Sequence, residues 1–284
     1  MSPWEKLLQK PHARGHLVQL YRDDEPSLVR NVSQYLCEGL RRGGGVLVIV
    51  TAEHRENFSR ELDRLGVGIE SAIHEKRLVF LDANETLSRF MVAGQPDWNR
   101  FEAVLSEAMH EMRPPEGEAG LRAYGEMVDV LWKARQFAAA IRLEQFWNKL
   151  LARSSFSLYC AYAIDIFNKE FHLGALDALL CAHTHLVPGE TNGNLEAAIN
   201  LAMDEILGPE ADRLRVLIKE NNRSSWAVMP NGERVILWLR KNLPDQAEQI
   251  VARARGYYQR LILQSAPALA NDDDERVALL PAIS

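Results

Sequence analysis

The run Val46–Thr51 constrains the fold of this chain more than any other segment. Its sequence, VLVIVT, is apolar up to the last residue and rich in β-branched side chains, so a strand formed here would be buried on both faces. Strands buried on both faces are typical of parallel sheets covered by helices. The three glycines at 43–45 precede the run, and we expect them to end a helix that begins near Pro26.

Four further apolar segments predict strands that alternate with helices. These segments are His16–Tyr21, Leu78–Leu81, Leu121–Glu126 and Ser157–Tyr162. Apolar residues at helical spacing predict the helices between them, including one from about Glu56 and a long one from Trp132 to Ala152. This alternation predicts an α/β fold, with a mostly parallel sheet flanked by helices and joined by right-handed crossovers.

The hydrophobic pattern changes after residue 189. Leu195–Leu207 is apolar at helical spacing, and a final helix is expected from Pro244. Between them, the dipeptide Asn231-Gly232 separates two apolar runs. Asn-Gly in that position is a strong signal for a β-hairpin, which here would span residues 226–238.

These signals divide the chain into three parts. Residues 12–188 form the α/β domain, residues 190–270 form a small α+β extension with the hairpin, and residues 271–284 form a flexible tail with an acidic run. The extension is expected either to associate with a partner or second copy, or to pack on the first domain. Aromatic residues such as Trp226 and Trp238 suit both roles.

Composition predicts the cellular compartment of the protein and the kinds of partner that it contacts. No apolar run approaches the roughly 18–20 residues of a membrane span, and the N-terminus lacks the apolar segment of a secretory signal. The cysteines Cys37, Cys160 and Cys181 form no CxxC pair. The net charge of −6 includes no basic excess in either half of the chain. We therefore expect a cytoplasmic protein with no membrane partner and no direct contact with nucleic acid.

The loop after the first predicted strand argues against a phosphate site. Ligands of doubly wound sheets bind at the carboxyl ends of the strands, so Arg22–Ser27 is the first place to look. This loop has three acids in a row and neither glycine nor lysine, whereas a phosphate-binding loop needs both. The chain also lacks a GxSxG nucleophile elbow. We expect no catalytic residues, and an enzyme is the less favoured interpretation.

Polar side chains at the strand ends are the candidate ligand contacts. Tyr21 ends the first predicted strand, and Glu53 follows the second. Glu126 and Asp129 lie near the end of the fourth, three residues apart. Such a pair suits metal binding or the positioning of a water molecule. Alternatively, the two acids cap the N-terminus of a helix, where their negative charge interacts favourably with the positive end of the helix dipole.

The segment Cys181–His185 contains the one histidine cluster of the sequence, His183 and His185. With Cys160 nearby in the fold, a zinc site is conceivable, because cysteine and histidine are the usual zinc ligands. HxH alone is a weak signal, however, and no second Cys/His pair completes a tetrahedron. We expect no metal and no cofactor, and we treat both histidines as candidates for lining the ligand site.

An ordered set of motifs also suggests a family. The motifs are His16–Tyr21, Tyr35–Gly43, Gly45–Thr51, Gly125–Asp129, Leu143–Asn148, Leu158–Tyr162 and Cys181–Pro188. Together they resemble the MEDS family, a sensory domain named from methanogens, methylotrophs and the dichloromethane-responsive regulator DcmR. The resemblance covers residues 12–188. It implies a RecA/KaiC-like fold with a degenerate P-loop, and a signalling input domain for small hydrocarbon-derived molecules, often joined to kinase or DNA-binding output modules in transcription regulation.

These observations favour a non-catalytic sensory protein that passes a signal to a protein partner or a second copy. Its small-molecule ligand would bind at the strand ends through Tyr21, Glu53, Glu126, Asp129, His183 and His185. Two alternatives stay open. One is a residual nucleotide-binding ATPase of the RecA/KaiC type, in which Glu53 and Glu126 would activate water or hold magnesium. The other is a pure protein-interaction module.

Overall fold

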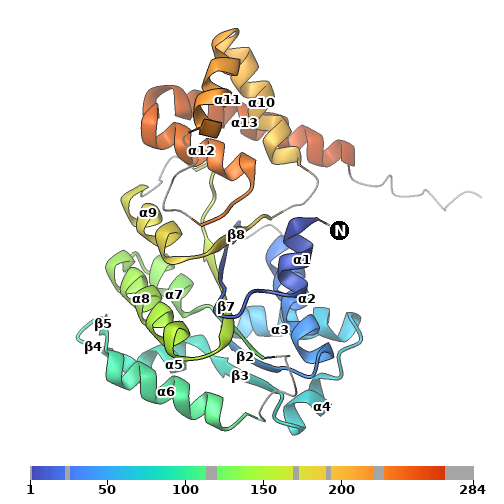
Figure 1. Cartoon of the computed structure of the whole chain (residues 1–284), viewed down its shortest axis with the longest axis vertical. Coiled ribbons are helices and arrows are strands. Elements are labelled where there is room, and N and C mark those ends of the chain that lie inside the picture. The colour runs from blue at the N-terminus through green and yellow to red at the C-terminus, as the bar shows by residue number, and fades with distance from the viewer. Residues whose placement is uncertain are drawn as a thin grey trace, which may run out of the picture.

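A six-stranded parallel sheet forms the centre of the molecule (Figure 1). The computed structural model describes residues 2–22, 26–112, 120–168, 173–189, 193–220 and 227–265. The strands are β1 (His16–Tyr21), β2 (Gly45–Val50), β3 (Leu78–Asp82), β6 (Leu121–Gly125), β7 (Phe156–Ala163) and β8 (His185–Val187). Their order across the sheet is β3-β2-β6-β7-β1-β8, and every neighbouring pair is parallel. The predicted α/β fold with a mostly parallel sheet is confirmed.

Strand β2 is buried along its whole length, as its composition predicted. Leu47 and Ile49 pack into the core on one face of the sheet, whereas Val46 and Val48 pack into the core on the other. This follows from the alternation of side chains along a strand. Burial of both faces explains why β2 has no polar position.

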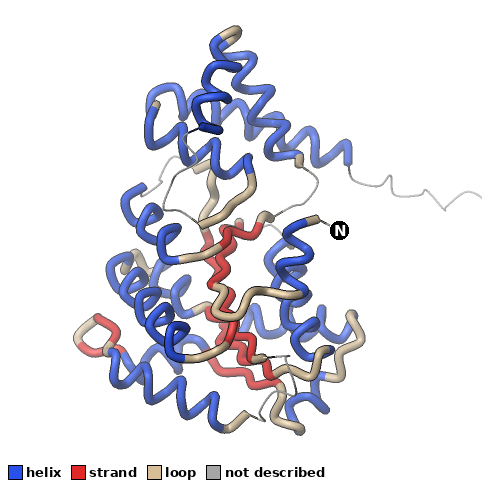
Figure 2. The backbone as a smooth tube through the Cα atoms, in the orientation of Figure 1, coloured by secondary structure: helices blue, strands red, loops and turns tan. Residues whose placement is uncertain are grey.

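Helices cover both faces of the sheet (Figures 1 and 2). One face carries α1 (Pro3–Gln9), α2 (Ser27–Arg41), α3 (Ala52–Arg64) and α4 (Ile69–His74). The other carries α5 (Ala83–Phe90), α6 (Trp98–His110), α7 (Met127–Lys133), α8 (Phe137–Arg153) and α9 (Leu173–Ala182). Between α5 and α6, β4 (Met91–Val92) and β5 (Gln95–Pro96) form a short antiparallel hairpin. None of the described helices combines the length and apolar composition needed to cross a membrane.

The single long helix predicted from Trp132 to Ala152 is wrong, because α7 and α8 are separate helices. Arg135 lies between them in the left-handed region, with φ of 59°. The N–H of Gln136 donates to the carbonyl of Leu131 at 2.9 Å. A left-handed residue with such a bond is a common way to end a helix. Apolar periodicity continues across this break, which is why the sequence did not reveal it.

The described part of the extension is a bundle of four helices next to β8 (Figure 1). They are α10 (Asn194–Leu207), α11 (Glu210–Glu220), α12 (Asn231–Asn242) and α13 (Pro244–Ser265). The bundle has a core of its own, with Ile199, Ile236 and Ile250 at 0–1% exposure. Trp226 and the predicted tail lie outside the described residues.

The hairpin predicted around Asn231-Gly232 is wrong: both residues belong to the first turn of α12. A type I′ hairpin turn needs positive φ at both central residues, and neither residue has it. Gly232 instead permits close packing on α10. A Cβ atom at this position would lie 2.9 Å from Cγ of Leu195 and 3.2 Å from the backbone nitrogen of Glu196.

The bundle is joined to the α/β domain by backbone pairing at the outer edge of β8. Val228 forms a parallel bridge with His185, and its N–H donates to the carbonyl of Thr184 at 2.9 Å. The N–H of Ala227 donates to the carbonyl of Leu180, also at 2.9 Å. The extension therefore continues the sheet beyond its last strand.

Candidate functional site

An open cleft of about 620 Å³ lies at the carboxyl ends of β1 and β2. We call it the carboxyl-edge cleft. Its lining residues are Tyr21, Arg22, Pro26, Leu28, Val29, Glu53, His54, Asn57, Arg60, Glu61 and Arg64. The end of β1, the start of α2 and one side of α3 supply these residues, as expected for a ligand site in a doubly wound sheet.

Asp129 holds the base of this cleft together. The Tyr21 hydroxyl donates to Asp129 Oδ2 at 2.7 Å, and the N–H of Ala163 donates to Asp129 Oδ1 at 2.7 Å. Lys133 Nζ lies 3.2 Å from Asp129 Oδ2 and donates to the Tyr21 hydroxyl at 3.1 Å. Asp129 therefore links the ends of β1 and β7 to the first turn of α7.

Glu126 makes a similar connection to the start of α3. Its Oε2 accepts hydrogen bonds from the N–H of Thr51 at 2.8 Å and from the Thr51 hydroxyl at 3.1 Å. Its Oε1 is hydrogen-bonded to His54 Nδ1. Glu126 is the N-cap residue of α7, but its side chain makes no capping bond to that helix. The carboxylate thus serves contacts across the sheet edge instead of the helix-capping role considered from sequence.

Two groups at this edge, His54 and Asp129, have raised pKa values for different reasons. Burial lowers the pKa of His54, but the hydrogen bond and charge of Glu126 outweigh it, and the net shift is upward. Burial raises the pKa of Asp129 despite the Ala163 N–H and the Lys133 ammonium. A raised pKa favours the imidazolium form of His54. Its ring is 15% exposed, and its Nε2 makes no hydrogen bond to any described residue.

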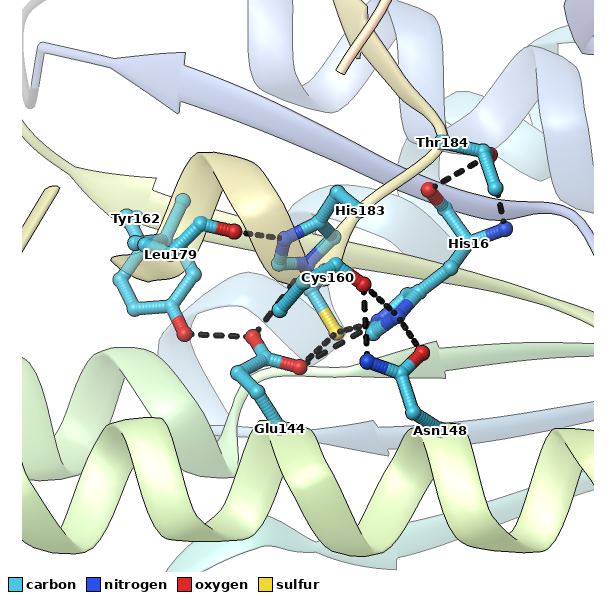
Figure 3. A network of polar contacts seen from close by, with 9 residues as sticks. His16, Glu144, Asn148, Cys160, Tyr162, Leu179, His183 and Thr184 are labelled. Carbon is cyan, nitrogen blue, oxygen red and sulfur yellow. Dashed lines mark hydrogen bonds and ion pairs between the residues drawn. The ribbon is translucent and has the colours of Figure 1, made fainter. Parts of the chain in front are cut away.

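A second group of polar side chains is buried between the sheet and helices α8 and α9 (Figure 3). It consists of His16, Glu144, Cys160 and His183, and we call it the His-Cys-Glu cluster. Each side chain offers one potential metal-ligand atom, and all four atoms lie within 4.8 Å of one another. The four residues are between 0% and 5% exposed.

The contacts within the cluster converge on Glu144. His16 Nε2 lies 3.2 Å from Glu144 Oε2, and His183 Nε2 lies 3.4 Å from Glu144 Oε1. Cys160 Sγ lies 3.8 Å from Glu144 Oε2 and 3.5 Å from His16 Nε2. The hydroxyl of Tyr162 also donates to Glu144 Oε1.

The far sides of both imidazole rings are held by hydrogen bonds (Figure 3). His183 Nδ1 lies 2.8 Å from the carbonyl of Leu179. His16 Nδ1 lies 2.9 Å from Asn148 Oδ1 and 3.2 Å from the carbonyl of Ala182. Since these oxygens only accept hydrogen bonds, Nδ1 is the protonated nitrogen in both rings. In the neutral rings Nε2 then carries a lone pair that faces the cluster.

Burial sets the direction of the pKa shifts of His16 and Cys160. It lowers the pKa of His16, as does the neighbouring His183, and so favours the neutral imidazole. It raises the pKa of Cys160 well above the ordinary value, which favours the thiol. Burial would also raise the pKa of Glu144, but the two histidines outweigh it and hold that pKa well below its usual range.

The predicted site residues fall in three places. Tyr21 and Glu53 line the carboxyl-edge cleft, and Glu126 and Asp129 are buried beneath it. His183 precedes β8 and belongs to the His-Cys-Glu cluster, so it does not reach the carboxyl edge. His185 is half-buried outside both sites, where its ring stacks on His12 at a centroid distance of 6.0 Å.

Sequence reasoning missed His54 and Lys133 at the cleft, and His16, Glu144 and Asn148 in the cluster. One signal for the cluster was present. Glu144 and Asn148 lie on the same face of α8 as Leu143, Trp147 and Leu151, which are buried. A carboxylate and an amide within an apolar helical stripe must find buried partners.

One family model matches most of the α/β domain. The family described as MEDS, the methanogen/methylotroph, DcmR sensory domain, matches residues 15–184. This range contains both sites and ends where the extension begins to pair with β8. A search of curated proteins finds no match to the chain. With more than half of its residues matched, the chain belongs to the MEDS family of sensory domains.

Proposed function

We propose that this protein is a non-catalytic sensor that binds a small molecule in the carboxyl-edge cleft. The observation that carries the proposal is His54, which lines the cleft with its Nδ1 held by Glu126 and its Nε2 without a hydrogen bond to any described residue. Pro26, Leu28 and Val29 provide an apolar wall beside it. Small-molecule sites combine such walls with a few convergent polar groups.

The chemistry of the cleft favours a ligand with a hydrogen-bond acceptor. The raised pKa of His54 favours the protonated ring, whose Nε2–H is a donor, and the amide of Asn57 lies on the same side of α3. Arg60 and Arg64 add positive charge, although Arg64 is already paired with Glu61. A short alcohol or carboxylate would satisfy both the donors and the apolar wall, in line with the hydrocarbon-derived ligands that the family implies.

We further propose that the α/β domain is a RecA/KaiC-like fold without a functional phosphate-binding loop. The sequence of residues 22–27 offers no glycine or lysine for a phosphate, and its acids at 23–25 lie outside the described residues. Both oxygens of Glu126 are engaged by Thr51 and His54. A carboxylate held in this way is poorly suited to activate water, which disfavours the alternative of a residual ATPase.

We also propose that the helical bundle transmits the signal from the cleft to a protein partner or a second copy. The guanidinium of Arg22 lies over the ring of Tyr258 in α13, 5.9 Å from its centroid. Tyr21 and Arg22 line both the cleft and a small apolar pocket next to Phe167 and Tyr258. A ligand that favours one arrangement of Arg22 would change the surface of the bundle available to a protein partner or a second copy.

Native mass spectrometry of the full chain purified from its own host tests for a carried small molecule. A thermal-shift series with short alcohols, halomethanes and carboxylates then identifies its class. We expect a stabilising compound whose effect is lost in His54→Phe and kept in Glu56→Gln, since Glu56 is an exposed residue of α3 outside the cleft. A ligand whose binding is the same in both variants would contradict the proposed site.

A further inference from the structure

We propose that the His-Cys-Glu cluster binds one four-coordinate divalent metal ion, with zinc as the best match to its donors. The ligands would be His16 Nε2, His183 Nε2, Cys160 Sγ and one carboxylate oxygen of Glu144. This site is separate from the carboxyl-edge cleft and does not depend on the proposed sensory ligand.

The spacing of the donor atoms fits a tetrahedral ion. Zinc–ligand distances of about 2.0–2.3 Å at tetrahedral angles place neighbouring ligand atoms roughly 3.3–3.8 Å apart. Contacts in the cluster include 3.2 Å between His16 Nε2 and Glu144 Oε2 and 3.8 Å between Cys160 Sγ and Glu144 Oε2, and all four ligand atoms lie within 4.8 Å of one another. An ion therefore fits between the donors with small side-chain adjustments.

The outer contacts of the histidines are those of metal ligands. A ligating histidine usually donates its other ring N–H to a carbonyl or carboxylate, which fixes the ring and its tautomer. His183 does so through the carbonyl of Leu179, and His16 through Asn148 and the carbonyl of Ala182. Asn148 is itself oriented by a 2.8 Å hydrogen bond from its amide to that same carbonyl.

A buried histidine nitrogen without a hydrogen-bond partner independently supports a metal ion in the cluster. His183 Nε2 is buried and has no hydrogen-bond partner, although the side chain is 0% exposed. Its nearest acidic atom, Glu144 Oε1, already accepts the hydroxyl of Tyr162. Two Nε2 lone pairs and a carboxylate facing one another repel, and a buried unpaired polar atom is costly. A cation at their centre would satisfy all of them.

Charge balance points to a divalent ion. Metal binding would convert the Cys160 thiol to a thiolate and release its proton to solvent. Together with the Glu144 carboxylate this gives two negative charges, which a divalent ion neutralises, while both histidines bind as neutral rings. The mixture of thiolate, imidazole and carboxylate favours zinc over magnesium or calcium, which prefer oxygen ligands alone.

Four protein ligands leave no open coordination position, so the ion would be structural. It would tie the start of β1 to β7, α8 and the segment between α9 and β8. That last segment also pairs with the helical bundle through Thr184 and Val228. The metal would thereby stabilise the connection through which the bundle is attached to the α/β domain.

Metal analysis of the full chain, purified without added chelator, is the first test. We expect one equivalent of zinc per chain. After removal of the zinc, titration with Co²⁺ should give the visible bands of tetrahedral cobalt and a near-ultraviolet thiolate-to-cobalt charge-transfer band. Circular dichroism before each titration verifies that the protein is folded.

Matched cysteine variants identify the thiol. The double variant Cys37→Ser/Cys181→Ser keeps the cluster intact and should retain the charge-transfer band, whereas Cys160→Ser should lose it. His183→Gln should lose stoichiometric binding, while His185→Gln, at a position outside the cluster, should keep it. The double variant keeps the test decisive even where Cys160→Ser does not fold.

Two results would overturn the proposal. One is a folded wild-type chain that takes up neither Zn²⁺ nor Co²⁺ at one equivalent, which would make the cluster a hydrogen-bonded core network. The other is a cobalt spectrum without thiolate ligation in the double variant. Neither result bears on ligand binding in the carboxyl-edge cleft, so failure of the metal site and failure of the proposed function can be distinguished.

Discussion

The Tyr21 hydroxyl donates a 2.7 Å hydrogen bond to Asp129 Oδ2, joining the last residue of β1 to the first turn of α7. Tyr21 is 3% exposed and Asp129 is 1% exposed, so solvent cannot readily replace the bond. Because Asp129 also accepts the N–H of Ala163, one buried carboxylate fixes the ends of two neighbouring strands directly below the cleft.

Tyr21→Phe is expected to lower the free energy of unfolding by about 1–3 kcal/mol, because it removes a donor from a buried charged acceptor. The control is Tyr257→Phe, which removes an exposed hydroxyl bonded to Glu205 and should cost clearly less. Urea unfolding of the full chain measures both. Equal losses would show that the Tyr21–Asp129 bond has no special role.

His54 should make stability depend on pH. Its folded pKa is raised by Glu126, so the folded state holds the proton more tightly than the unfolded state. This stabilisation is complete below the unfolded pKa of about 6.5 and is lost as the pH rises through the folded pKa. The difference in unfolding free energy between wild type and His54→Gln should therefore shrink as the pH rises from about 6 into the alkaline range.

Urea unfolding across that range measures the effect of His54. The matched control is His74→Gln, a change at an exposed ring on α4, which should leave the pH dependence of wild type intact. A difference between wild type and His54→Gln that grows with pH would contradict the direction of the shift.

Five of the six strands of the sheet were predicted because each one is a local signal, whereas the three-residue β8 was not predicted. A run such as Val46–Thr51 shows its burial on both faces through its own composition. The failure at Asn231-Gly232 had a non-local cause, since Gly232 is required by its approach to Leu195 in α10. The sequence shows which residues are small, but it does not show whether a turn or a neighbouring helix requires them to be small.

The two candidate sites also differ in whether local sequence signals could reveal their residues. Tyr21 and Glu53 could be predicted because the carboxyl ends of parallel strands are a general place for ligands. The His-Cys-Glu cluster could not, because its members come from β1, α8, β7 and the segment between α9 and β8 and meet only through the fold. His183 was noticed in the HxH motif, whereas its partners His16 and Glu144 are isolated residues in apolar segments.

Asn148 should tune the proposed metal site without being a ligand. Asn148→Ala removes the acceptor that orients His16 Nδ1, and loss of such an outer partner typically weakens metal binding by about 10- to 100-fold. Competition with a chromogenic zinc chelator measures the change. Asn242→Ala, at an exposed position of α12, is the control and should bind zinc like wild type. Wild-type affinity in Asn148→Ala would contradict the outer role.

We expect no ATP hydrolysis above background, because residues 22–27 lack the glycine and lysine of a phosphate site and Glu126 is occupied by Thr51 and His54. A steady-state phosphate-release assay on the full chain with magnesium measures this. Turnover above background that is abolished in Glu126→Gln would instead favour the residual ATPase.

The helical bundle is expected to stabilise the α/β domain. Leu237 of α12 is 1% exposed and lies in the same core cluster as Leu180 and Leu186. A fragment of residues 1–189 would lose this packing and expose the outer edge of β8, which Val228 now covers. An uncovered edge strand next to apolar surface favours aggregation. We therefore expect a lower melting temperature and lower solubility for the fragment.

A thermal melt and light scattering of the fragment separate this role from an interface. A chain that ends at residue 265 is the control and should melt like the full chain. If the bundle serves mainly in association, the 1–189 fragment should stay equally stable but change its mass in solution. Leu237→Ala tests the packing without truncation and should cost about 2–5 kcal/mol. An equally stable fragment of unchanged oligomeric state and partner binding would contradict both roles.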